Sequence, residues 1–289
     1  MSYREGKDFN IETLEYKSSK VVNFDSYTAD DLAGLWRKTL KSGMHGICFS
    51  MYEDGQEPGD TITETQVERR IKILKPYTKW IRSFSCIEGN EHIPRLAHKH
   101  GLKTMVGAWL SDDDEKNEEE INTLINLAKE GCVDIAVVGN EVLYRNDLSL
   151  GALLNFMNRV RAAIPEHIPV GYVDAYYEFS VHPELVEHSD VILSNCYPFW
   201  EGCLEEYALN HMQQMYGQAM DAAKGKKVII TETGWPSKGE SLKGAVPGET
   251  HAMKYFINTQ VWAKKAGICL LYTSPSPRDV EESRMPSSA

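Results

Sequence analysis

The chain has 289 residues, with 31 Lys and Arg against 42 Asp and Glu and a formal net charge of −11. This length fits one large α/β domain or two small ones, and 42% hydrophobic residues can fill a substantial core. Nucleic acids and anionic membrane surfaces are polyanions, so the acidic balance argues against both as partners and is compatible with a neutral substrate.

Seven apolar runs of strand length recur along the chain, separated by segments with helical periodicity. Runs this apolar are typical of parallel strands that are buried on both faces. We predict these strands at residues 46–52, 80–86, 102–109, 133–141, 168–173, 190–197 and 227–233.

The segments between the runs predict helices. Thr63 and Gln66 form a capping-box pattern ahead of an apolar face, which indicates where one helix begins. An additional helix precedes the first strand, and we expect it to cover the floor of the fold. The other long helices include residues 204–224 and 249–266, and the additional helix spans residues 30–41.

Seven βα units of roughly 20 to 35 residues predict one parallel α/β domain, and an eighth unit would close a (β/α)8 TIM barrel. The alternative is an open doubly-wound sheet, but no G-x-G-x-x-G motif follows an early strand and no P-loop is present. We therefore predict an incomplete catalytic barrel over residues 43–268, preceded by an extension and the barrel-floor helix over residues 1–42.

The C-terminal sequence departs from this pattern where an eighth strand would fall. Residues 269–279, CLLYTSPSPRD, resemble the in-frame translation of a transposase adapter used in DNA sequencing, and the rest is aperiodic. We expect residues 269–289 to be a non-native tail, with an unusual natural tail as the alternative, and the chain to lack its own eighth strand and helix. The apolar run 268–272 can still take the eighth position. Such a fragment should be poorly soluble and weakly active, because exposed strand edges favour aggregation.

Two glutamates end apolar strands at the same end of the predicted barrel. Glu141 ends one strand and Glu232 lies near the end of another, where the catalytic groups of these barrels are found. Hydrolysis of a glycosidic bond needs one carboxylic acid that protonates the leaving oxygen and one carboxylate that attacks the anomeric carbon or activates water. One such glutamate is often a structural cap or an ion-pair partner. Because these two strands face each other across a barrel, we take both glutamates as catalytic candidates.

Aromatic and basic residues at other strand ends complete the predicted site. Tyr52, Trp200 and Trp235 offer rings on which the C–H faces of sugars stack, with core packing as the alternative for the two tryptophans. Arg82 either neutralises a buried acid or keeps one glutamate ionised, so that it can act as a nucleophile. The sequence shows no cluster of metal ligands and no G-x-S-x-G motif, so we predict no metal, no cofactor and no serine mechanism.

The cysteines and the apolar segments bear on the location of the protein. The six cysteines form no C-x2-C pair, and most lie in or beside apolar runs, so we expect reduced core thiols. No apolar run reaches about 18 residues, and no apolar leader opens the chain, so we predict no membrane segment. The cytoplasm is the default expectation for a localisation that the sequence leaves open, and we expect a monomer.

Two motifs resemble those of glycoside hydrolase family 17, which comprises β-1,3-glucanases and related β-glucan transferases. They are Val-Gly-Asn-Glu at residues 138–141 and Ile-Thr-Glu-Thr-Gly-Trp-Pro-Ser at residues 230–237. Three further segments strengthen the resemblance: residues 45–50, 77–82 and 195–202.

This resemblance implies a role for each matching residue. Glu141 would be the general acid/base and Glu232 the nucleophile of a double displacement with retention. Asn140 would bind the 2-hydroxyl of the substrate, and Arg82 and Tyr197 would orient or tune Glu232. The two carboxyl groups would then lie roughly 5 to 5.5 Å apart, with the pKa of Glu141 above that of Glu232.

Three functions fit these observations. The favoured one is a retaining hydrolase of β-glucan, with β-1,3 linkages implied by the resemblance. The second is a β-glucan transglycosylase that uses the same glutamates, with a second sugar in place of water. The third is a non-catalytic carbohydrate-binding barrel. Loops at the mouth decide between water and a sugar as acceptor, so the sequence does not separate the first two functions.

Overall fold

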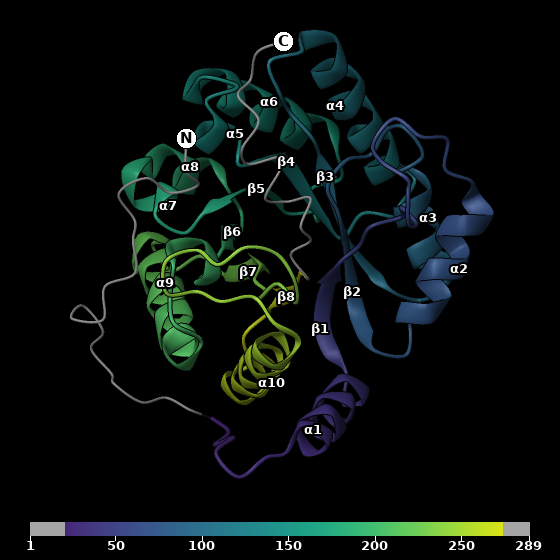
Figure 1. Ribbon diagram of the computed structural model, residues 1–289. Helices are drawn as coiled ribbons and strands as arrows, with labels where there is room; N and C mark the ends of the chain where they lie inside the picture. The colour runs from purple at the N-terminus through teal and green to yellow at the C-terminus, as the bar shows by residue number, and fades with distance from the viewer. Residues whose placement is uncertain (1–20, 274–289) are drawn as a thin grey trace.

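Eight parallel strands curve into a barrel in the computed structural model, which describes residues 21–273 (Figure 1). Their order around the sheet is β7-β6-β5-β4-β3-β2-β1-β8, so neighbours in the chain are neighbours in space. The predicted TIM barrel is confirmed, because a doubly-wound sheet would reverse its strand order. The strands are β1 (Met44–Cys48), β2 (Thr78–Ser83), β3 (Lys103–Ala108), β4 (Ile135–Asn140), β5 (Val170–Ala175), β6 (Ile192–Asn195), β7 (Val228–Glu232) and β8 (Leu271–Tyr272).

The first seven strands overlap the seven predicted runs, and the eighth lies within the apolar run at residues 268–272. Leu271 of β8 pairs with Gly46 of β1, where a Cβ on the glycine would lie 2.7 Å from Leu271 Cγ. On the other side, β8 and β7 form no regular ladder: an isolated bridge joins Ile230 to Leu270, and the Thr273 amide donates to the Thr233 carbonyl at 2.9 Å, which leaves a loosely closed seam. The eighth position is therefore occupied. The non-native origin of residues 269–289 stays a prediction, and residues 1–20 and 274–289 lie outside the described part of the chain.

Helices surround the barrel on its outside (Figure 1). Within residues 21–273, no helix is both long enough and apolar enough for crossing a bilayer. The helices are α1 (Ala29–Lys41), α2 (Glu64–Leu74), α3 (His92–Lys99), α4 (Asp114–Lys129), α5 (Val142–Arg145), α6 (Leu150–Ala163), α7 (Glu178–Val181), α8 (Pro183–His188), α9 (Ala208–Ala222) and α10 (Glu249–Ala266), with 3-10 turns η2 (Phe199–Glu201) and η3 (Glu205–Tyr207).

The additional N-terminal helix does not lie where we predicted it. Helix α1 packs against α10 on the outer wall, where Trp36 contacts Phe256 with ring centroids 5.9 Å apart. Phe256 in turn contacts Tyr272 of β8 at 4.9 Å. At the floor, a cavity of about 290 Å³ is lined by residues from strand starts and by none from α1. The prediction of a floor helix is wrong because α1 packs its apolar face against α10.

One predicted helix start also differs in detail. The Thr63 hydroxyl accepts from the Gln66 amide as predicted, but the Gln66 side chain donates to the Met51 carbonyl at 2.9 Å instead of closing a capping box. The reciprocal pair of bonds occurs at α1, between Thr28 and Asp31.

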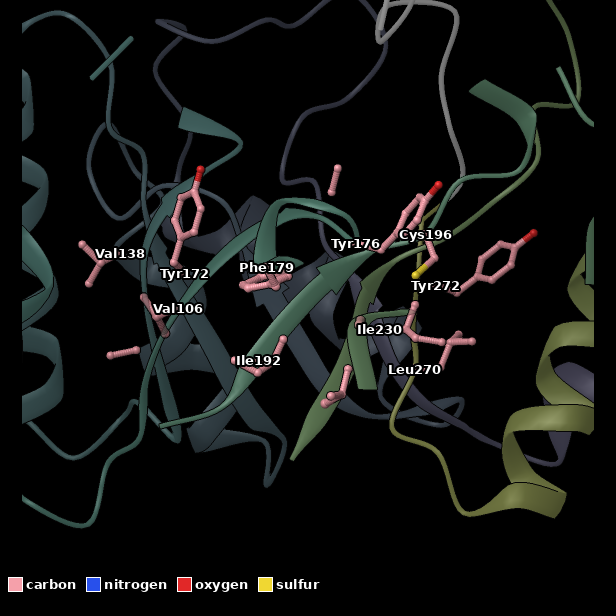
Figure 2. Packing of buried hydrophobic residues seen from close by; sticks show 14 of the residues in the cluster. Val106, Val138, Tyr172, Tyr176, Phe179, Ile192, Cys196, Ile230, Leu270 and Tyr272 are labelled. Atoms are coloured by element: carbon pink, nitrogen blue, oxygen red, sulfur yellow. The ribbon is translucent and has the colours of Figure 1, made fainter. Parts of the chain in front are cut away.

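The core has two apolar layers, one inside the barrel and one between the barrel and its helices. Val137 of β4 and Val173 of β5 belong to the inner cluster, whereas Val138 and Tyr172 of the same strands belong to the outer one (Figure 2). Successive residues of a strand point to opposite faces, so strands between two such layers must be apolar throughout. This arrangement explains the continuous apolar runs in the sequence.

Candidate active site

Glu141 and Glu232 lie at the same end of the barrel, as predicted. Glu232 is the last residue of β7, and Glu141 directly follows the last residue of β4. Glu232 is 8% exposed and Glu141 is half-buried, so neither carboxyl group is sealed from solvent. The C-terminal ends of the strands carry the catalytic groups in barrels of this type.

The backbone at the end of β4 turns sharply to direct the Glu141 side chain. Gly139 has φ 83°, and a Cβ at this position would lie 2.9 Å from Val142, so only glycine fits. Glu141 itself has φ 52° and ψ 29°, in the left-handed region that is uncommon for residues with a side chain. Its amide donates to the Val173 carbonyl of β5 at 2.8 Å. Such strained residues cluster at functional sites and persist only where the surrounding contacts hold them.

Arg145 of α5 supplies part of that support. Its guanidinium donates to the carbonyls of Asn140 and Leu110 and pairs with Asp147 at 2.6 Å, and it stacks on the Trp109 ring with 4.5 Å to the centroid. The turn that carries Glu141 is thus tied to the neighbouring strand end.

Asn195, the last residue of β6, joins the two glutamates. Its amide nitrogen donates to Glu141 Oε1 at 2.8 Å and to Glu232 Oε1 at 3.1 Å. Its amide oxygen accepts from the Thr231 hydroxyl at 2.8 Å, which sets the orientation of the amide, since a flipped group would place its oxygen against two carboxylates. The two N–H bonds of an amide diverge by about 120°, which puts the two acceptor oxygens roughly 5 Å apart.

Arg82 of β2 binds both Glu232 and Asn140. The guanidinium is 1% exposed and donates to Glu232 Oε1 at 2.6 Å and to Asn140 Oδ1 at 2.7 Å. The Tyr197 hydroxyl donates to Glu232 Oε2 at 2.9 Å. The structure thus brings together Arg82, Asn140, Tyr197 and both glutamates from four strands, β2, β4, β6 and β7.

Sequence reasoning missed two residues of this cluster. Asn195 was visible only as a strand-end residue and had no assigned role. Cys48 of β1 was interpreted as a core thiol, yet its sulfur donates to the Thr231 carbonyl at 3.2 Å and lies 3.7 Å from the Arg82 guanidinium. Burial raises the pKa of the Cys48 thiol to about 11, so it stays neutral beside the buried ion pair. Cys48 ends the strand next to the one that carries Arg82, and this position was the signal in the sequence for a place near the site.

Trp235 does not offer a sugar-binding surface. It is 1% exposed, its indole nitrogen donates to the Val246 carbonyl at 2.9 Å, and its ring packs against Phe199 and Tyr255 at 5.2 and 5.6 Å. The prediction that Trp235 binds substrate is therefore wrong, and its alternative role in core packing holds.

Trp200 and Tyr52 are both partly exposed. Trp200 contacts Phe199 edge-on at 5.0 Å. Their contribution to sugar binding stays a prediction. Among residues 21–273, no three His, Cys, Asp or Glu side chains gather in a way that would hold a metal ion.

A parallel β/α barrel with a carboxylate pair at the ends of its fourth and seventh strands is the architecture of a glycoside hydrolase. The family model of the BtgE/BtgC glycoside hydrolase domain matches residues 46–276, so the chain belongs to this family and the resemblance to glycoside hydrolase family 17 is confirmed.

Known relatives agree with this assignment. Glucan 1,3-beta-glucosidase from Saccharomyces cerevisiae is 26% identical over 235 residues, which cover 73% of this chain and 72% of the relative. Probable glucan endo-1,3-beta-glucosidase btgC from Aspergillus flavus is 28% identical over 61% of this chain and 28% of that longer protein. The crystal structure of the family 17 beta-1,3-glucanosyltransferase from Rhizomucor miehei is 29% identical, with a TM-score of 0.74, and covers 83% of this chain and 90% of that one. An endo-laminarinase from Formosa shares the fold, with a TM-score of 0.69 at 18% identity over 89% of this chain and 83% of that one.

Proposed function

We propose that this glycoside hydrolase acts on β-1,3-glucan by double displacement, with Glu232 as the nucleophile and Glu141 as the general acid/base. The observation that carries the proposal is the Asn195 amide that binds both carboxylates and sets their oxygens roughly 5 Å apart. Retaining enzymes place their carboxyl groups at about 5 to 5.5 Å, whereas inverting enzymes leave room for a water molecule at about 6.5 to 9.5 Å. The names of the yeast and Rhizomucor relatives support β-1,3-glucan as the substrate.

The surroundings of the two glutamates fit different roles. Glu232 accepts hydrogen bonds from Arg82, Asn195 and Tyr197, a donor set that suits an anionic nucleophile. Glu141 is bound by Asn195 and is more exposed than Glu232, so it can exchange a proton with the leaving oxygen and then with water.

The reaction then runs in two steps. In the first, Glu232 attacks the anomeric carbon while Glu141 gives its proton to the departing glycosidic oxygen, which leaves a glycosyl-enzyme ester. In the second, Glu141 takes a proton from water as that water attacks the same carbon and releases Glu232. Asn140 has its amide oxygen bound by Arg82, which orients its NH2 group to donate to the 2-hydroxyl of the sugar.

The test uses Glu232→Gln and Glu141→Gln on laminari-oligosaccharides, with Glu184→Gln of the exposed face of α8 as the matched control. Both site variants should lose at least about 10³-fold in kcat/KM, whereas the control should keep wild-type activity. Proton NMR of the wild-type reaction should show the β-anomer as the first product. Full turnover by either site variant, or an α-anomeric first product, would contradict the proposal.

Transfer of the glycosyl group to a second sugar is the other candidate function. The similarity to the Rhizomucor glucanosyltransferase, at 29% identity, supports this candidate. Both reactions share the first step and differ only in whether water or a sugar hydroxyl attacks the glycosyl-enzyme. Product sizing at rising oligosaccharide concentration separates them. Products longer than the substrate indicate transfer, and only shorter products indicate hydrolysis.

A further inference from the structure

Glu141 occupies the N-cap position of α5, the short helix that follows β4. The first amides of a helix have no partner within the helix, and the side chain of the N-cap residue usually accepts from one of them. The Glu141 side chain makes no such capping bond, and its carboxyl group is bound instead by the Asn195 amide, which also binds Glu232. The first turn of α5 therefore needs an acceptor from another element.

Tyr172 of β5 supplies this acceptor. Its hydroxyl accepts from the amide of Leu143, the second residue of α5, at 3.0 Å. Its ring packs against the same turn, because a Cβ on Gly139 would lie 3.3 Å from Cε2 of the ring. Figure 2 shows Tyr172 beside Val138 of β4. The tyrosine is fully buried, so the bond to the amide is shielded from water.

Asp174, two residues further along β5, fixes the orientation of the Tyr172 hydroxyl. Its Oδ2 accepts from that hydroxyl, and its Oδ1 accepts from the Ala175 amide at 2.7 Å. A tyrosine hydroxyl has one proton, and donating it to Asp174 leaves the lone pairs of the oxygen for the Leu143 amide. Asp174 is fully buried, and these contacts explain why a carboxyl group lies within an apolar strand.

We infer that Tyr172 is a positioning residue that caps α5 in place of Glu141 and so keeps the Glu141 carboxyl group directed toward Asn195 and the glycosidic oxygen. This inference rests on the proposed function, in which Glu141 is the general acid/base. Without the hydroxyl, the Leu143 amide loses its acceptor, and the carboxyl group of the N-cap residue can take its place. A carboxyl group drawn to that amide moves away from the leaving oxygen, and a displacement of about 1 Å can cost on the order of 100-fold in rate.

The variant Tyr172→Phe tests the inference, because it removes the hydroxyl and keeps the ring. Two substrates are compared: a laminari-oligosaccharide, whose leaving oxygen needs a proton from Glu141, and a dinitrophenyl β-laminarioside, whose leaving group departs without one. The kcat/KM, which reports the first step, should fall about 10-fold to 100-fold for the oligosaccharide and stay within about threefold of wild type for the dinitrophenyl substrate. Tyr216→Phe is the matched control and should keep both values, because its ring packs on Trp262 between α9 and α10, with centroids 6.0 Å apart.

Two results with Tyr172→Phe would overturn the inference. Equal losses on both substrates would show a structural role only, and unchanged values on both would show that the hydroxyl does not position Glu141. Asp174→Asn should give the same difference between the substrates, because the single oxygen of asparagine cannot accept from both donors in the geometry of the carboxylate. This second variant decides by the same comparison if Tyr172→Phe does not fold.

Hydrogen exchange tests the capping bond in the wild-type protein. The Leu143 amide lies in the first turn of a helix and should nevertheless exchange slowly with deuterium, because it donates to a buried hydroxyl. Fast exchange of this amide would overturn the inference. Failure of the proposed function is a different result: Glu141→Gln would then lose no more activity on the oligosaccharide than on the dinitrophenyl substrate.

Discussion

The Asn195 amide provides the sharpest test of the site geometry. Its single NH2 group serves both glutamates, and its oxygen is held by Thr231. Replacement by alanine removes both donors at once, leaves the Thr231 hydroxyl without its acceptor and lets the two carboxyl groups move relative to each other. The change alters no charge and lies in a fully buried side chain at the end of β6.

The magnitude follows from these contacts. A hydrogen bond to a charged group contributes about 1.5 to 3 kcal/mol, and losing the Asn195 bonds releases Glu141 and Glu232 from the positions that the proposed reaction needs. A loss of about 2 kcal/mol in transition-state stabilisation corresponds to roughly thirtyfold in kcat/KM. We therefore expect Asn195→Ala to fall between about 10-fold and 150-fold below wild type.

The assay is the steady-state hydrolysis of a laminari-oligosaccharide, with urea unfolding to show that the variant is folded. Asn158→Ala, an exposed change on α6, is the control and should be silent. Asn195→Asp should be more damaging than alanine, because it places a third carboxylate between the two glutamates. A folded Asn195→Ala enzyme within about threefold of wild type would refute the reasoning that this bridge sets the catalytic spacing.

Three further outcomes concern stability. Trp235→Phe should lower the free energy of unfolding by about 1 kcal/mol, because the hydrogen bond to the Val246 carbonyl is lost. The KM for the glucan should stay unchanged, and a raised KM would instead indicate that Trp235 binds sugar. Leu271→Ala should lower the free energy of unfolding by about 2 to 5 kcal/mol, because Leu271 is fully buried in the inner layer. An unchanged urea midpoint would show that β8 does not pack in the barrel in solution. Burial and the charges of Lys227 and Lys79 lower the pKa of His45 to about 4, so the unfolded chain binds a proton that the folded one refuses. The free energy of unfolding should therefore fall as the pH drops from about 6.5 to 4, and it should fall less in His45→Gln. Equal decreases in the wild-type protein and the variant would contradict this prediction.

The sequence alone determined the repeating architecture and the two glutamates. Strand burial on both faces leaves a continuous apolar run, and helices leave a period of 3.6 residues, so the seven units were readable from local patterns. Glu141 and Glu232 were found because each ends such a run, which is a property of chain position and does not require contacts.

Tertiary structure decided the partners of each side chain. Asn195 bridges the glutamates because β6 lies beside β7 with a shift in register between Ser194 and Asn195. Trp235 shares a sequence motif with Glu232 yet turns into the outer layer, and α1 follows the wall instead of the floor. Tyr172 looks like an ordinary residue of an apolar strand until the turn after β4 brings the Leu143 amide to its hydroxyl. Such contacts join residues that are distant in sequence, and they depend on register, twist and the direction of each side chain, which local periodicity does not encode.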